Sequence, residues 1–144
     1  HHPTAPHPGG VGAEYALRQA LRTADANECD VDHVNAHGTS TPLGDATEAA
    51  MLARTLTGDY TVTSNKGALG HTMGAAGAIE AALTALAIHH QTIPPTANYH
   101  KPAPGCDGIR IVHDRPQHQP VQLAVSNSIG FGGHNATLAL RGAP

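Results

Sequence analysis

The first half of the chain alternates segments with helical and extended spacing of hydrophobic residues. In 11–24 the apolar residues recur every three or four positions while arginine and glutamine take the opposite face, which predicts an amphipathic helix. The segment 31–36 is short and partly β-branched, and a glycine follows soon after it, which predicts a strand that delivers His37 to a loop. A second helix over 46–56 is expected to begin at Asp45, whose carboxylate is a good N-cap.

The second half begins with another short strand and a long apolar helix. Residues 60–64 alternate β-forming side chains, and the Gly- and Ala-rich segment 66–77 leads into a helix over 75–90. This helix is hydrophobic nearly all round, so we expect it to be buried. Three further strands are expected over 109–112, 121–126 and 136–141. Helices and strands in this order predict a layered α/β fold.

Composition limits the chain to one domain with a core of small side chains. Its 144 residues, 40% of them hydrophobic, suffice for a single globular domain over 1–144. Aromatic residues make up only 3%, so the core has to be built from Ala, Leu, Val and Ile at short backbone distances.

Charge and hydropathy argue against two classes of partner. The formal net charge is −3 and the eight Lys and Arg residues are scattered, so the chain offers no basic stripe for nucleic acid. No segment approaches the ~20 consecutive apolar residues of a membrane-spanning helix, and the first ten residues lack the features of a signal peptide. We expect a cytoplasmic protein that binds neither nucleic acid nor membrane.

Candidate chemistry is concentrated in three polar clusters, each joined to a flexible turn. The first, 37–41, reads His-Gly-Thr-Ser-Thr; the second runs from Lys66 through His71 to Gly77; the third, 127–135, reads Asn-Ser-Ile-Gly-Phe-Gly-Gly-His-Asn. A histidine that follows a strand and precedes hydroxyl residues can hold a polar substrate arm beside a proton-handling group. Each cluster alone has a plainer alternative, a satisfied structural histidine or a glycine turn that only closes a hairpin.

In their order and spacing, the three clusters together resemble the HGTST, KxxxGHxxGAAG and GFGGxN motifs of the β-ketoacyl-acyl-carrier-protein synthases of fatty-acid and polyketide assembly. The resemblance extends over almost the entire chain and includes the loop 2–6 and the turn 94–98. It implies the second, C-terminal half of a thiolase-like α/β fold, in which two similar halves stack as α/β/α/β/α layers. We expect this chain to lack that half's first strand, because nothing strand-like stands ahead of the loop 2–6.

The resemblance also implies an acyltransferase whose nucleophile lies outside this chain. Members of the family condense malonyl thioester, carried on acyl carrier protein, with an acyl group held on a cysteine of the first half. Neither Cys29 nor Cys106 stands in the small-residue setting of that cysteine. The expected partners are acyl carrier protein, the cysteine-bearing half and a second subunit of a homodimer or heterodimer. No cofactor is expected, because the phosphopantetheine arrives on the carrier protein as part of the substrate.

Transferred position by position, the family mechanism assigns roles to residues of this chain. It gives His37 and His71 the decarboxylation of malonyl thioester and the stabilisation of the resulting enolate. The pantetheine and acyl pocket is expected to be lined by Thr4, Thr39, Thr41, Gly132 and Gly133.

Further residues support this site in the family. Lys66 is expected to support the second histidine loop with Glu80 as its counter-charge, and the alternative is an ordinary buried ion pair. Phe131 matches the gating phenylalanine, whose backbone N–H completes the oxyanion hole for the acyl-cysteine. Ile129 departs from the pattern, since many relatives carry a second Phe there, so no acyl length follows from this loop.

Two other classes of function stay open on the sequence. Twelve histidines, with His33 and His37 four apart, raise metal binding, but that spacing serves zinc on a helix and this segment is predicted to be a strand. We therefore expect no metal. Because the cysteine-bearing half is absent, the third candidate is an inactive structural or pairing module.

Overall fold

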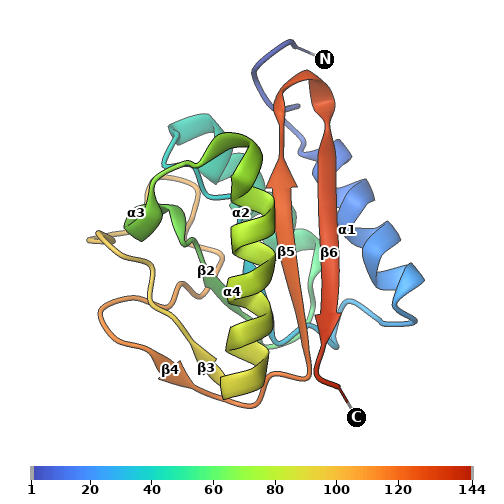
Figure 1. The fold of residues 1–144 in the computed structure, drawn as a ribbon. Helices are drawn as coiled ribbons and strands as arrows, with labels where there is room; N and C mark the ends of the chain where they lie inside the picture. The colour runs from blue at the N-terminus through green and yellow to red at the C-terminus, as the bar shows by residue number, and fades with distance from the viewer. Residues whose placement is uncertain (1, 144) are drawn as a thin grey trace.

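A mixed sheet with helices on both faces forms the structure, a computed structural model that describes residues 2–143 (Figure 1). Its long helices are α1 (Val11–Thr23), α2 (Pro42–Thr55) and α4 (Ala76–His90). The main sheet contains β1 (His33–Asn35), β2 (Thr61–Thr63), β5 (Leu123–Ile129) and β6 (Asn135–Arg141). Shorter elements are α3 (Lys66–Leu69), η1 (Met73–Ala75), η2 (Phe131–Gly133), β3 (Thr92–Ile93) and β4 (Gln117–His118).

Strand β1 lies inside the main sheet, whose order is β2-β1-β5-β6. It pairs in parallel with both neighbours, so that Val34 lies opposite Val62 on one side and Val125 on the other. Strand β6 is antiparallel to β5. The carboxyl ends of β2, β1 and β5 therefore meet at one edge of the sheet, where ligand sites of such sheets usually form.

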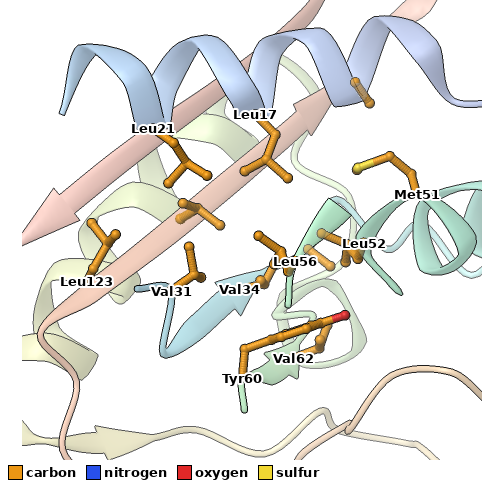
Figure 2. Close-up of a cluster of buried hydrophobic side chains, with 13 residues drawn as sticks. Leu17, Leu21, Val31, Val34, Met51, Leu52, Leu56, Tyr60, Val62 and Leu123 are labelled. Atoms are coloured by element: carbon orange, nitrogen blue, oxygen red, sulfur yellow. The ribbon is translucent and has the colours of Figure 1, made fainter. Parts of the chain in front are cut away.

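The two faces of the sheet carry separate hydrophobic cores. Leu123 and Val125 of β5 point into the larger one, with side chains of α1 and α2, while Ala124 between them points into the smaller one, beneath α4. Figure 2 shows the larger core, which is built mainly of aliphatic side chains and includes Leu17, Leu21, Val34, Met51, Leu52 and Val62. The alternation of side chains along a strand thus produces the expected α/β/α layers.

The second long helix begins earlier than the sequence predicts. Its N-cap is Thr41, Pro42 occupies the first helical position, and Asp45 lies within the first turn instead of capping it. Proline suits that position because its fixed φ is already helical and its missing N–H would have no partner there.

The second half of the chain holds three further departures from the predicted strands. Residues 109–112 form only an isolated bridge between Ile111 and Val62, beside the edge of β2. Strand β5 runs to Ile129, three residues beyond its predicted end, because it pairs residue by residue with β6 up to the turn. The short pair β3 and β4 was not predicted, since two-residue strands leave no periodic pattern.

The prediction that the apolar helix would be buried is wrong for one of its faces. Helix α4 buries Ala76, Glu80, Thr84, Ala87 and Ile88 against the sheet, whereas Leu86 on its other side is 51% exposed. The reason is that the described residues supply only one layer for it to pack on. No helix in the described part of the chain combines the length and apolar character needed to cross a membrane.

Strand β6 ends the sheet. Among residues 2–143 it pairs only with β5, so its other edge carries backbone groups without a strand partner. Such an edge is a template for a further strand. Among residues 2–143, no strand precedes α1.

Candidate active site

All three polar clusters of the sequence lie at the carboxyl ends of the parallel strands. The loop with His37 follows β1, the segment with Lys66 and His71 follows β2, and Phe131 lies in the turn that follows β5. Residues separated by up to 94 positions in the sequence, as His37 and Phe131 are, are thereby placed at one edge of the sheet.

The backbone of His37 is held by a buried carboxylate. Glu48 on α2 accepts the N–H groups of His37 and Gly38, each at 3.0 Å, and the side-chain amide of Asn127 at 3.2 Å. These donors favour its charged form, although burial, the larger effect, raises the pKa of the Glu48 carboxyl. Glu48 thus ties the histidine loop to both α2 and β5.

The ring of His71 has a defined proton position when it is neutral. Its Nδ1 accepts the backbone N–H of Met73 at 3.2 Å. A nitrogen that accepts a hydrogen bond carries no proton, so the neutral ring holds its proton on Nε2. His71 therefore offers an Nε2–H donor.

The two histidines of the first and second clusters face each other. The ring centroids of His37 and His71 are 5.6 Å apart and the rings are nearly perpendicular, at 84°. Burial, the charge of Lys66 and the neighbouring His71 lower the pKa of His37 to about 4. His37 is consequently neutral near pH 7, a state in which one ring nitrogen can donate a hydrogen bond.

Lys66 and Glu80 form the ion pair that the sequence analysis expected. Lys66 Nζ contacts Glu80 Oε1, and their side chains are only 6% and 4% exposed. Below them Asn35 of β1 donates to Asn65 Oδ1, to the Glu80 carbonyl and to Thr84 Oγ1. A buried polar network thus connects β1, the start of α3 and α4 directly behind the histidines.

The two threonines of the first cluster lie together in the loop between His37 and helix α2. Thr39 Oγ1 and Thr41 Oγ1 are 3.0 Å apart and share a hydrogen bond, and Thr41 is exposed. Burial raises the pKa of the nearby Asp45 carboxyl, and the backbone N–H groups of residues 39–41 partly offset this shift. The two hydroxyls are therefore accessible, and the backbone N–H groups of the same segment interact with the Asp45 carboxylate.

The third cluster forms a short turn with an exposed aromatic side chain. Phe131 is 68% exposed, and Gly132 and Gly133 have φ of 72° and 83°, values that side chains with a Cβ rarely adopt. The N–H of Gly132 donates to the carbonyl of Pro3 at 2.8 Å. This bond brings the loop that carries Thr4 beside the turn, so Thr4 and both glycines lie at the same end of the molecule.

Neither cysteine has the setting of a nucleophile facing the histidines. Cys29 precedes β1 and lies at the opposite end of the sheet from His37. Cys106 is buried, and burial together with Asp45, Asp107 and Glu48 raises the pKa of its thiol, which disfavours the reactive thiolate. Within residues 2–143 no group of three or more His, Cys, Asp or Glu side chains is arranged to hold a metal ion.

Sequence reasoning missed the contacts that hold the histidine loop. It gave no role to Glu48, Ser64 or Asn127. A weak signal was present, because Glu48 falls on the inward side of a helix otherwise lined there by Ala49, Met51 and Leu52. A charged residue among core positions usually has a specific partner.

The sequence of this chain is similar to those of known proteins. The model of the β-ketoacyl synthase C-terminal domain matches residues 1–100. The 3-oxoacyl-[acyl-carrier-protein] synthase 2 of Mycobacterium leprae is 42% identical over 139 residues, which cover 96% of this chain and 33% of that protein.

Solved structures show the same similarity. The ishigamide ketosynthase/chain length factor superposes with a TM-score of 0.92 and 36% identity, covering 99% of this chain and 35% of that one. A type II PKS acyl-carrier protein in complex with its ketosynthase bound to the hexaketide gives a TM-score of 0.93 at 28% identity, covering 100% and 36%.

The matched domain and the superposed structures define the class of fold, the thiolase-like fold of the ketosynthases. This chain belongs to the β-ketoacyl synthase family, of which it contains the C-terminal domain. It spans about a third of the length of the relatives it matches.

Proposed function

We propose that this chain is the malonyl-decarboxylating part of a 3-oxoacyl-[acyl-carrier-protein] synthase, completed by a cysteine-bearing half. The observation that carries the proposal is the pair of facing imidazoles of His37 and His71, 5.6 Å apart at the carboxyl ends of the strands. The names of the relatives, 3-oxoacyl synthase and ketosynthase, support the same chemistry.

The two imidazoles suit the charge that develops during decarboxylation. The bond between the malonyl carboxylate and Cα breaks, CO2 leaves, and the electron pair becomes an enolate whose oxygen is the former thioester carbonyl. Two fixed N–H donors in a partly buried site stabilise that oxygen, an effect worth roughly 2.7–4 kcal/mol per donor. His71 donates through Nε2–H, and His37 is neutral because its pKa is about 4.

The enolate then requires an acyl thioester to attack. Its Cα forms the new carbon-carbon bond with the acyl carbonyl carbon, and the cysteine sulfur leaves as a thiolate. In this proposal the Phe131 N–H meets the acyl oxygen and the Phe131 ring guards the acyl pocket. The exposed ring and the positive φ of the two following glycines support a turn that can move.

The hydroxyls of Thr39 and Thr41 would hold the amides of the pantetheine arm at the mouth of the site. Thr4, Gly132 and Gly133 would line the remaining wall, which the hydrogen bond between Gly132 and Pro3 supports. Lys66 would maintain the positive potential behind the histidines, with its charge balanced by Glu80. No cofactor enters this scheme.

The surface of the chain supports the need for a cysteine-bearing half. Helix α4 exposes Leu86 and the apolar side chains beside it, and β6 leaves one edge unpaired among the described residues. Acyl carrier protein and a second ketosynthase subunit are proposed as further partners, by analogy with a solved relative bound to its carrier and another with a chain length factor.

The proposal is tested by separating the two halves. We expect the 144 residues alone to form no acyl-enzyme by intact mass, to decarboxylate no malonyl carrier protein and to associate in size-exclusion chromatography. Adding a cysteine-bearing half should restore both reactions. A monomer that becomes acylated at Cys29 or Cys106 would overturn the proposal, and a folded complex that decarboxylates nothing would favour a pairing module.

A further inference from the structure

We propose that Ser64 is a positioning residue for His37, acting through the Gly38 carbonyl. This inference rests on the proposed function, since it concerns how the decarboxylating histidine is held. It starts from a polar contact that lies outside the three motif clusters: Ser64 Oγ donates to Gly38 O at 2.8 Å.

The contact continues a strand pairing that the backbone can no longer make. Strands β1 and β2 pair up to Asn35 and Thr63, and one further backbone bond joins the Ala36 N–H to the Thr63 carbonyl at 2.8 Å. Beyond it the chain turns at Gly38, whose φ is 40°. The Ser64 hydroxyl then takes the place of the next backbone donor.

The turn at Gly38 is closed from both sides. Glu48 accepts the N–H groups of His37 and Gly38, while Ser64 binds the Gly38 carbonyl from the direction of β2. A Cβ at Gly38 would lie 2.7 Å from the Ser64 Cβ, so the backbone rests directly on this side chain. Three successive peptide units around His37 are thus fixed by two side chains.

Ser64 is itself held by the loop that follows β3. Its N–H donates to Thr96 Oγ1 at 3.2 Å, and the neighbouring Thr63 Oγ1 donates to the Pro94 carbonyl at 2.7 Å. The same loop contacts the segment ahead of His71, where Asn98 Nδ2 donates to the Gly67 carbonyl at 2.9 Å. The loop 94–98 is therefore hydrogen-bonded to the end of β2 and to the segment that precedes His71. Ser64 connects this loop to the backbone next to His37.

Loss of the Ser64 hydroxyl should affect the histidine more than the pantetheine threonines. Thr39 and Thr41 share their own hydrogen bond, and the N–H groups of residues 39–41 face Asp45. Gly38 lies between this segment and β1. Without the hydrogen bond from Ser64, the backbone at Gly38 can rotate and change the direction of the His37 ring. The rate of decarboxylation depends on that direction, whereas substrate binding is little affected.

The test compares two hydroxyl deletions in the complete, cysteine-containing enzyme. For Ser64→Ala we expect kcat of malonyl decarboxylation to fall about ten-fold, with KM and cysteine acylation within about two-fold of wild type. Hydrogen exchange of the peptide 36–41 should become faster. Ser64→Thr, which keeps a hydroxyl, should recover most of both losses.

Thr23→Val is the matched control, because it removes a hydroxyl-to-carbonyl bond, from Thr23 Oγ1 to Gln19 O at 2.8 Å, that lies on α1 and does not reach the histidine loop. It should leave kcat and the exchange of 36–41 unchanged. If Ser64→Ala fails to fold, Ser64→Cys, with a weaker donor, is expected to show the same loss of kcat.

Two results overturn the inference and are distinguishable from each other. If His37→Ala abolishes decarboxylation while Ser64→Ala keeps it within two-fold of wild type, the function stands and the positioning role fails. If His37→Ala itself leaves decarboxylation unchanged, the proposed function fails and the positioning role falls with it.

Discussion

Two histidines four positions apart, His33 inside the sheet and His37 at its edge, have nearly the same pKa in different surroundings. The pKa of each is lowered to about 4, and burial is the largest cause in both cases. His33 is 1% exposed and its Nδ1 is hydrogen-bonded to Thr61 Oγ1 at 3.1 Å, within the strand layer. His37 faces Lys66 and His71, and its Nδ1 is buried with no protein partner among the described residues.

The difference shows that a shifted pKa marks burial and does not by itself mark function. A histidine whose ring is satisfied within the sheet stabilises the fold in its neutral form. His37 instead shares a site with a second imidazole and a cation, and that grouping has chemical use. The contacts indicate that the sheet interior around His33 and the sheet edge around His37 are chemically separate regions.

The largest expected effect is on decarboxylation, which should depend on the histidines at the sheet edge and not on His33 inside the sheet. In the complete enzyme, His37→Ala and His71→Ala should each lower malonyl decarboxylation by about 10²–10³-fold, because each removes a donor to the enolate oxygen. Transfer of the acyl group to the cysteine, followed by intact mass, should persist at least in part. His33→Gln is the control and should retain normal decarboxylation per folded molecule; a comparable loss there would contradict the division.

The next effect is on the pH dependence of folding stability, to which the buried His33 should contribute. Because the folded pKa of His33 lies below its ordinary 6.5, the unfolded chain binds the proton first as the pH falls. Its stabilising contribution is thus complete above pH 6.5 and is lost between pH 6.5 and about 4, by about 3 kcal/mol for a shift of this size. Urea denaturation across this range should show a shallower pH dependence for His33→Gln than for wild type. Parallel curves would exclude His33 as the cause.

A smaller effect is expected from Thr39, on kcat/KM for the carrier-bound substrate. Thr39→Val removes a hydroxyl that we propose pairs with a pantetheine amide, and the unpaired amide should cost about 1–3 kcal/mol in kcat/KM for the carrier-bound substrate. Thr23→Val, on the far helix α1, removes an exposed hydroxyl bonded to the Gln19 carbonyl and serves as control. Unchanged kinetics for Thr39→Val would contradict the assignment.

The smallest effect concerns the cation behind His37. The double variant Lys66→Met with Glu80→Gln removes the buried pair without leaving an isolated charge. Since Lys66 lowers the pKa of His37, that pKa should rise, while the pKa of His33 should stay where it is. Histidine titration by NMR measures both, and Lys101→Met on the exposed surface is the control. A shift in the pKa of His33 with none in that of His37 would contradict the assignment of Lys66 to the surroundings of His37.

Local patterns predicted the individual parts of the fold. The helices at 11–24 and 75–90 and the strands around Val34 and Val62 were found within one or two residues, because their apolar residues recur with one clear period. Helix α2 was placed too late, since an acidic cap was preferred over Pro42 as the first helical residue. The strand predicted at 109–112 failed, because apolar residues there pack as a loop with one bridge to β2.

The sequence alone determined the chemical inventory: two histidines followed by glycine-rich turns, hydroxyls beside the first, a lysine and a glutamate near the second, and the family they resemble. These features lie within short segments, so residue type and spacing are enough to recognise them. Only the tertiary structure decided that His37 and His71 face each other at 5.6 Å and that Glu48 and Ser64 hold the first of them. It also decided that one face of α4 is exposed, with Leu86 at 51%. The reason is physical: contacts between distant segments depend on the parallel order of β2, β1 and β5, and no local pattern encodes which strands become neighbours.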